Sequence, residues 1–213
     1  MATFLKGIHG AYSGKVGNIV GSNWRSVDYV RSVARPTNKP ASLKQLAQRE
    51  KFALSTAFLG PLKELLNLGY SDVQQGKSTG YNQALRDVLK FAITGIYPDF
   101  EIDYSRVRIS RGALANLFVP QWTESAPQEI TLTWMKSTSD LMGYNDDSVI
   151  LLVYNKDKKY FNLMESATRD DETLTLTFPS VYAGDTIVGW VFTGHRDGVK
   201  TSSSEYIGEL TLS

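Results

Sequence analysis

Glycine recurs at positions 7, 10, 14, 17 and 21, and Gly14-Lys15 lies in the middle of this run, so a phosphate site is the first possibility to test. A P-loop requires G-x-x-x-x-G-K-[ST], in which backbone N–H groups surround the phosphates and a hydroxyl reaches magnesium. Here the first glycine of that motif falls on His9 and the hydroxyl position falls on Val16. The dinucleotide motif G-x-G-x-x-G fails too, because no two of these glycines are two residues apart. The sequence therefore predicts no nucleotide cofactor at this run.

Few other residues are candidates for catalysis. Cysteine is absent, which excludes disulfides, thiolate chemistry and cysteine zinc sites. The two histidines, His9 and His195, leave little for acid–base work. His195 begins the stretch His-Arg-Asp-Gly, which we interpret as a turn because Asp-Gly follows a predicted strand. We expect a protein that is not an enzyme and that needs no cofactor, metal or small-molecule substrate.

Two acidic runs, Asp146-Asp147 and Asp170-Asp171-Glu172, could bind calcium, because hard cations take several oxygens from one loop. Neither run has the spacing of an EF-hand. Charged clusters at turns are usually hydrated. We interpret both runs as solvated loops, and calcium binding stays open at this stage.

Charge is distributed unevenly along the 213 residues. Residues 1–51 carry nine Lys and Arg against two acidic residues, a net charge of +7. Residues 111–213 carry eight against fourteen, a net charge of −6. A basic segment joined to an acidic one suits either a polyanion or a second copy of the same chain.

Three regions are predicted. Residues 1–40, here called the N-terminal arm, carry two short strands near residues 17–24 and 28–35 that read as a β-hairpin. Residues 41–98 show the 3.6-residue period of packed helices, with a break at Gly60-Pro61 and an end at Gly95.

Residues 99–213 change to a period of two, which is typical of strands. Turn residues between the apolar runs favour an antiparallel β-sandwich of the fibronectin-III or immunoglobulin-like type, and the absence of cysteine excludes the antibody version. The chain is thus predicted to be α+β. The seven expected strands are residues 104–109, 130–134, 148–154, 160–163, 174–178, 186–193 and 205–212.

The N-terminal arm is the strongest binding candidate. Its forty residues are rich in aromatic side chains and glycine, and a lone hairpin is only marginally stable. We expect the arm to dock on its own body or on a second copy by adding extended backbone to a sheet edge. A head-to-tail contact of this kind gives rings or filaments. The predicted interface residues are Gly14, Lys15, Gly17, Val20, Gly21, Trp24, Arg25, Tyr29, Arg31 and Arg35.

Several stretches resemble a known family: residues 12–22, 29–32, 102–105 and 204–208. The chain resembles bacterial proteins of similar length, common in Bacteroidetes, that are grouped as domain of unknown function 6266. This resemblance implies no activity and no catalytic residues. More weakly, the spacing Pro40-x4-Gln45-x3-Arg49-x2-Phe52 is similar to segments of phage structural proteins, which favours a role in assembly.

The sequence thus predicts a non-enzymatic structural subunit that self-associates through its arm. One alternative is a nucleic-acid-binding module, in which Trp24 and Tyr29 stack on bases and arginines neutralise phosphates. A weaker alternative is a carbohydrate- or surface-binding module that uses the loops at residues 137–147 or 194–204. No apolar run of about 20 residues predicts a membrane span. The first 17 residues do not resemble a secretory signal, so the cytoplasm is the default, with virion-like or signal-independent export left open.

Overall fold

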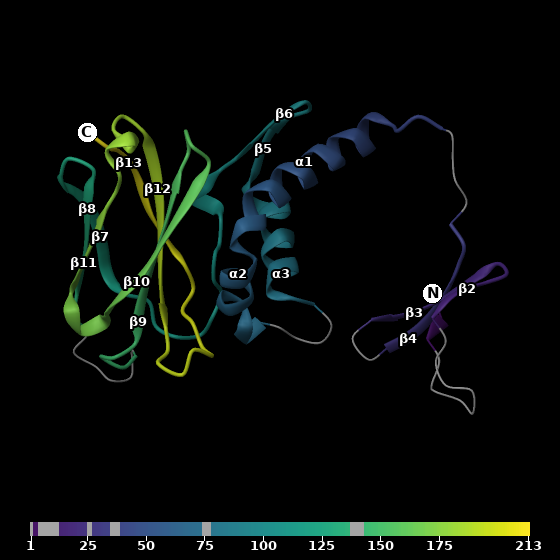
Figure 1. The fold of residues 1–213 in the computed structure, drawn as a ribbon, viewed down its shortest axis with the longest axis horizontal. Coiled ribbons are helices and arrows are strands. Elements are labelled where there is room, and N and C mark those ends of the chain that lie inside the picture. The colour runs from purple at the N-terminus through teal and green to yellow at the C-terminus, as the bar shows by residue number, and fades with distance from the viewer. Residues whose placement is uncertain (1, 4–12, 25–26, 35–38, 74–77, 137–142) are drawn as a thin grey trace. The chain divides into compact units, whose positions relative to one another are not determined.

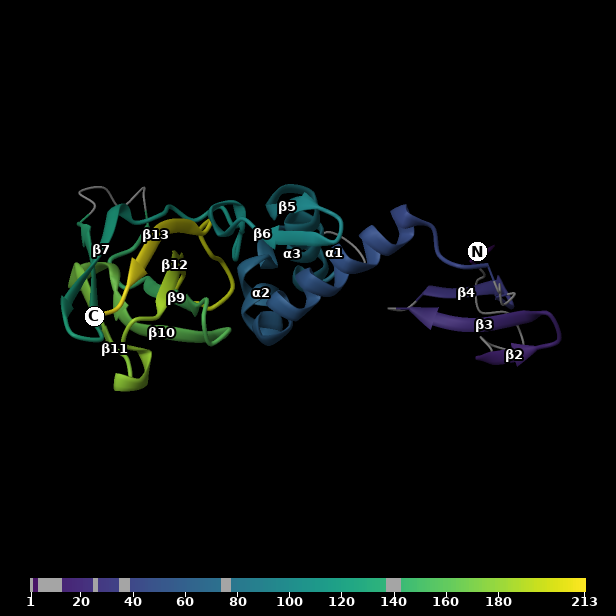
Figure 2. The same cartoon turned by 90° about the horizontal axis from the view of Figure 1, so that it is seen from above.

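The computed structural model describes residues 2–3, 13–24, 27–34, 39–73, 78–136 and 143–213. The chain forms two compact units, Met1–Ser42 and Leu43–Ser213. Figures 1 and 2 show the elements of each unit from two directions. Among the described residues, none of the helices combines the length and the apolar character of a membrane span.

The first unit is an antiparallel sheet. Its strands are β1 (Ala2–Thr3), β2 (Gly14–Val16), β3 (Ile19–Trp24) and β4 (Val27–Ser32), in the order β1-β4-β3-β2. The predicted hairpin is confirmed as the β3–β4 pair. β2 joins β3 through a two-residue turn in which Gly17 has φ +58°, a value that glycine adopts readily at the first position of a tight hairpin turn.

Helices open the second unit, and their predicted break is confirmed. α1 (Leu43–Leu59) ends where the short 3-10 turn η1 (Gly60–Leu62) places Pro61, and α2 (Lys63–Gly69) follows. After η2 (Ser71–Val73), α3 (Gly80–Asp87) begins with the Thr79 hydroxyl accepting from the Asn82 N–H at 3.2 Å. A π turn, η3 (Val88–Ala92), ends the helical segment.

A short hairpin then follows that the sequence did not predict. β5 (Ile93–Ile96) pairs with β6 (Asp99–Ile102), so the expected boundary between residues 98 and 99 falls inside this hairpin. Gly95 has φ +89°, and a Cβ there would lie 2.2 Å from the carbonyl oxygen of Asp99. Glycine is needed at this position because an L side chain would meet both strain and a clash.

The sandwich is confirmed, and the described residues contribute seven strands to its two sheets. One sheet has the order β10-β9-β12-β13 and the other has the order β11-β8-β7. The strands are β7 (Phe118–Ala126), β8 (Glu129–Met135), β9 (Ser148–Asn155), β10 (Tyr160–Thr168), β11 (Thr173–Thr177), β12 (Thr186–Gly194) and β13 (Glu205–Thr211).

The prediction of a strand at residues 104–109 was wrong. Residues 104–106 form a 3-10 turn, η4 (Tyr104–Arg106), because the Asp103 carboxylate accepts from the Ser105 N–H at 3.1 Å and starts a turn. Val107 and Ile109 are buried as the alternation predicted, but no strand pairs with them among the described residues. The seventh strand is β7 instead.

The sheet β10-β9-β12-β13 is buried on both faces, which explains the continuous apolar runs in β9 and β12. One face packs on the other sheet through residues such as Leu151, Val153 and Val191. The opposite face packs on the helices through Leu152, Trp190 and their neighbours. Figures 1 and 2 show α1, α2 and α3 on one side of this sheet and β7, β8 and β11 on the other. Helices and sandwich therefore share a core.

Candidate functional site

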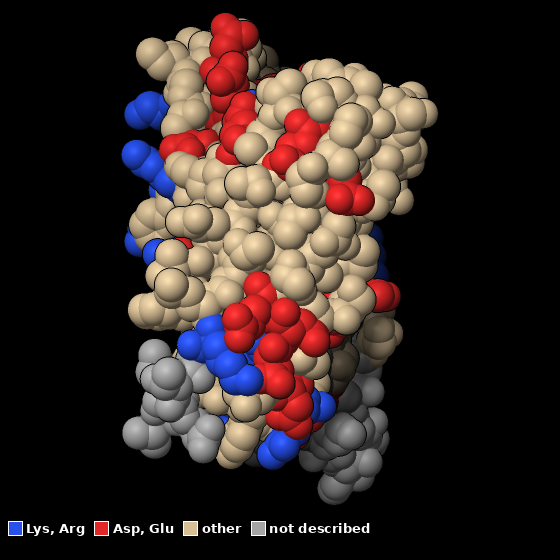
Figure 3. Space-filling view, turned by 90° about the vertical axis from the view of Figure 1, so that its left-hand side faces the viewer, with Lys and Arg blue, Asp and Glu red and all other residues tan. Residues whose placement is uncertain are grey.

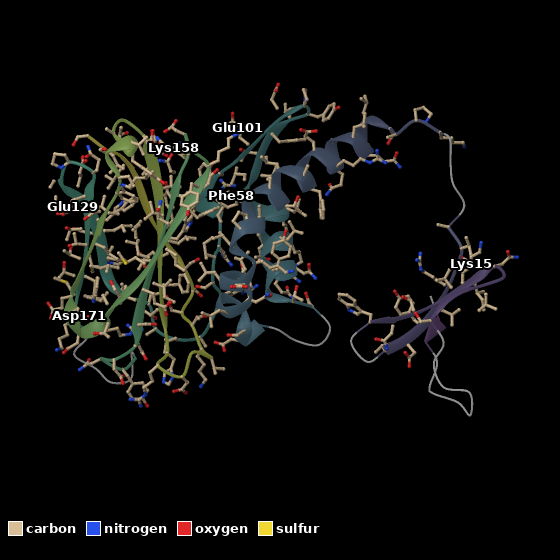
Figure 4. All side chains as sticks on the ribbon, in the orientation of Figure 1. Lys15, Phe58, Glu101, Glu129, Lys158 and Asp171 are labelled. Atoms are coloured by element: carbon tan, nitrogen blue, oxygen red, sulfur yellow. The ribbon has the colours of Figure 1, made fainter. Side chains whose placement is uncertain are left out.

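The register of the arm sheet places five of the ten predicted interface residues on one face. Lys15 lies opposite Val20, which lies opposite Arg31. Tyr29 is two residues before Arg31, and Trp24 is four residues after Val20. Because side chains alternate between the faces of a strand, these five residues share one surface, here called the basic aromatic face. Figure 4 labels Lys15 on β2.

The predicted glycines have a different place. Gly14 and Gly21 lie opposite each other on the other face of the sheet, and Gly17 forms the β2–β3 turn. Arg25 and Arg35 lie outside the described residues. Since Gly14-Lys15 belongs to a paired strand rather than to a loop before a helix, the structure gives no phosphate cradle at this position.

The basic aromatic face carries no carboxylate among the described residues. Asp28 lies on the opposite face, where its Oδ1 accepts from Asn23 Nδ2 at 2.7 Å. Trp24 is 50% exposed, and Arg31 is also exposed. The face can therefore offer an aromatic ring and two cations to an anionic or apolar surface.

The arm sheet has little apolar burial of its own. The buried residues among its described positions are Gly21 and Asp28. Val16 and Ile19 are 59% and 42% exposed. Both hydrophobic clusters of the described chain begin at or after Phe58. Within the described residues, the sheet thus lacks the apolar core that usually stabilises an isolated hairpin.

A motif that the sequence analysis missed lies before α3. Residues 76–80 read Gly-Lys-Ser-Thr-Gly and have the spacing of a nucleophile elbow, G-x-S-x-G. That elbow needs a strand before it, whereas here the preceding elements are α2 and η2. Thr79 caps α3, and a Cβ at Gly80 would lie 2.4 Å from the carbonyl oxygen of Leu66. Thr79 and Gly80 therefore serve the packing of α3 on α2.

The two acidic runs are tied into ion pairs and hydrogen bonds. Asp146 lies 2.9 Å from Arg196, and the hydrogen bond from Arg196 lowers the pKa of Asp146. Asp171 accepts from the Thr168 N–H at 2.7 Å, which lowers the pKa of its carboxyl. Asp170 pairs with Lys136. In the described residues no group of three or more His, Asp or Glu is placed to hold a metal ion.

A second candidate site is an aromatic cleft in the Leu43–Ser213 unit, with a volume of about 790 Å³. Phe58 comes from α1, Tyr104 from η4, Tyr154 from β9, Phe161 from β10 and Tyr206 from β13. Figure 4 labels Phe58 and, on β6, Glu101, which also lines the cleft. Sequence reasoning missed this cleft because its residues are contributed by separate segments and share no motif.

The rings of the cleft form one cluster. Tyr154 and Phe161 have centroids 4.5 Å apart, and Phe58 lies 5.2 Å from Tyr154 and 5.7 Å from Tyr104. Burial and the neighbouring Tyr154 hydroxyl raise the pKa of Tyr104 to about 12. The Tyr104 phenol therefore stays protonated at neutral pH and remains able to donate a hydrogen bond.

Charged groups line the wall of the cleft. Lys156 Nζ lies 3.0 Å from Glu209 Oε1 and 5.8 Å from the centre of the Tyr104 ring. Glu101 makes no ion pair within the described part of the chain. Such a mixture of aromatic surface and a few polar groups is typical of ligand sites.

The fold and these sites define an α+β protein in which helices cover one sheet of a fibronectin-III-like sandwich, with a small N-terminal sheet as a separate unit. The sequence matches the model of the family of unknown function DUF6266 over residues 11–208, and the chain belongs to that family. No curated protein matches the sequence.

Among solved structures, the chain is similar to fibronectin III domains of two human proteins. The domain of the collagen alpha-1(XX) chain has a TM-score of 0.32 and 14% identity, and the match covers 48% of this chain and 87% of that one. The domain of contactin 1 has a TM-score of 0.33 and 11% identity, and the match covers 56% of this chain and 91% of that one.

Proposed function

We propose that this protein is a non-enzymatic assembly subunit, and that the basic aromatic face of its N-terminal arm binds a second copy of the chain. The observation that carries the proposal is that the described residues of the arm sheet form no apolar core. A sheet whose apolar side chains stay in water gains little from folding. Docking on another molecule would supply the burial that the described residues of the sheet do not provide.

The distribution of charge favours a second copy as that molecule. The basic aromatic face offers Lys15 and Arg31, while residues 111–213 carry a net charge of −6. On the side of the sandwich in Figure 3, acidic side chains gather toward both ends of the face. Opposite charges steer two molecules together, and a contact between unlike surfaces is heterologous, which produces rings or open chains.

The experiment compares sets of substitutions in the full-length protein. Trp24→Ala combined with Arg31→Ala removes an exposed ring and a cation from the basic aromatic face. Since aromatic and arginine residues dominate binding energy at interfaces, we expect the dissociation constant of self-association to rise about tenfold or more, measured by sedimentation velocity over a range of concentrations.

The matched control lies on the other face of the same sheet. Val16→Ala combined with Ile19→Ala also removes exposed apolar surface, but is expected to change the dissociation constant less than about threefold. If both pairs weaken association equally, the basic aromatic face is not the interface. If the unsubstituted protein is monomeric throughout, the assembly role itself is wrong.

A nucleic-acid-binding module is the second candidate, because the same face combines Trp24 and Tyr29 with two cations. Base stacking and phosphate neutralisation would suit single-stranded nucleic acid. This candidate predicts that the protein shifts a single-stranded oligonucleotide in a gel and that the binding weakens steeply as salt is added. The Lys15→Ala/Arg31→Ala variant is expected to give no shift. Binding that persists both in the double variant and at high salt excludes this candidate.

A further inference from the structure

A basic hollow of about 430 Å³ adjoins the aromatic cleft. Lys90 from η3 and Arg106 and Arg108 from the segment after β6 line it, together with the hydroxyl-bearing residues Ser105, Ser204 and Tyr206. Among the described residues, none of those that line it is Asp or Glu. Lys90 and Arg108 make no ion pair within the described residues, so two cations face the hollow without a protein carboxylate to neutralise them.

The hollow and the cleft share a wall. Ser105 and Tyr206 line both of them. Asp103 lies at this junction, where its Oδ2 is 3.0 Å from Arg106 Nε. A ligand that crosses from one site to the other would therefore meet aromatic rings and carboxylates first, and cations with hydroxyls next.

The chemistry of the two adjacent surfaces restricts the class of ligand that they can bind together. The rings in the cleft suit a molecule with an apolar face, while Glu101 and Glu209 suit a molecule whose polar groups donate hydrogen bonds. In the cleft, Lys156 is paired with Glu209, and Glu101 disfavours an anionic group beside it. Lys90 and Arg108 favour such a group in the hollow. A sugar ring has an apolar face and hydroxyl donors, so it suits the cleft. An acidic sugar linked to it would place an anionic group in the hollow.

We propose that the cleft and the hollow together bind an acidic oligosaccharide, with a neutral face of one sugar on the aromatic rings and the carboxylate or sulfate of a neighbouring sugar beside Lys90 and Arg108. The cleft lies toward the β9–β10 turn, whose Lys156 and Lys159 line it. Residues 194–204, where the sequence placed its carbohydrate alternative, connect β12 and β13 at the opposite end of the sheet, and of these residues Ser204 lines the hollow. The site uses no residue of the arm, so its failure would leave the assembly proposal standing.

Isothermal titration of the full-length protein tests this site with four probes. Hexagalacturonic acid and a heparin-derived hexasaccharide are the acidic probes, and maltohexaose and xylohexaose are the neutral ones. We expect at least one acidic probe to bind with a dissociation constant between about 1 µM and 1 mM, and the neutral probes to bind at least about tenfold more weakly. If neither acidic probe binds, or if a neutral probe binds as tightly as the acidic ones, the proposal is wrong.

Substitutions then separate a built site from general charge attraction. Lys90→Gln and Arg108→Gln are each expected to weaken the acidic probe about tenfold, because each removes a charge-assisted hydrogen bond. Lys63→Gln, which removes an exposed lysine of α2 outside both sites, is expected to leave binding unchanged. An equal loss in all three variants would show that the interaction is only long-range attraction.

Glu101→Ala gives the sharpest contrast. Charge attraction alone predicts that loss of this carboxylate strengthens an acidic probe, because a like charge is removed. The proposed site predicts weaker binding instead, because Glu101 accepts from the sugar hydroxyls. Tighter binding of hexagalacturonic acid by this variant would overturn the assignment of the cleft.

Discussion

Replacing Arg169 by methionine is expected to lower the free energy of unfolding by about 3–5 kcal/mol. Arg169 Nε donates to Asp147 Oδ2 at 3.1 Å, and Nη1 donates to the carbonyl oxygen of Asn116 at 3.1 Å. Nη2 donates to Thr193 Oγ1 at 2.9 Å and to the carbonyl oxygen of Ala115. Asp147 is fully buried, so removal of the guanidinium leaves an uncompensated carboxylate inside the protein. Chemical denaturation gives the measurement.

Two further variants isolate this effect. Arg196→Met breaks the exposed pair with Asp146 and is expected to cost less than about 1 kcal/mol, as exposed pairs do. Asp147→Asn in the Arg169→Met background removes the stranded charge and should recover part of the loss. A cost below about 1 kcal/mol for Arg169→Met would contradict a structural role for the buried pair.

The Trp190→Ala substitution is expected to lower the free energy of unfolding by about 3–5 kcal/mol. Trp190 is fully buried in the core that joins helices and sheet, and its ring lies 6.3 Å from Phe58 on α1 and 6.1 Å from Tyr206 on β13. Because these elements share one core, helix circular dichroism and tryptophan fluorescence, to which the buried Trp122 and Trp134 of the sandwich contribute, should report one transition in the unsubstituted protein.

The control is another tryptophan. Trp24 of the arm sheet is half exposed and outside both cores, so Trp24→Ala should change the free energy of unfolding by about 0.5 kcal/mol or less in the monomer. Separate transitions for the helical and tryptophan signals would contradict the shared core, and so would equal costs for the two tryptophans.

The strands and helices with strong periodicity were predictable from sequence. The β3–β4 hairpin, the break at Gly60-Pro61 and the buried strands β9 and β12 follow from local patterns. β7 was missed because Pro120 and several polar residues weaken its pattern. Its place at the edge of its sheet tolerates these residues, since an edge strand leaves one row of backbone groups unpaired.

At residues 106–109 the local sequence predicted which side chains are buried, but it did not predict whether the segment pairs with a strand. Val107 and Ile109 alternate with Arg106 and Arg108, and both apolar residues are buried while both arginines are exposed. The segment lacks a partner strand among the described residues, and nothing in the alternation itself could show that. The same alternation directs the two arginines to the basic hollow.

The two candidate sites differ in how much of each could be predicted from the sequence. The basic aromatic face lies on adjacent strands joined by short turns, so residue order and strand alternation place Trp24, Tyr29 and Arg31 together. The aromatic cleft draws Phe58 and Tyr206 from elements nearly the whole unit apart in sequence. Their meeting depends on how the helices pack on the sheet, which no local pattern specifies.

Sedimentation velocity of the full-length protein beside a chain of residues 43–213 tests the central claim most directly. The shorter chain keeps both hydrophobic cores, so it is expected to fold and to sediment as a monomer at every concentration. The full-length protein is expected to form larger species that grow with concentration and shrink with added salt. Identical monomeric sedimentation of the two chains at low salt and high concentration would contradict assembly through the arm.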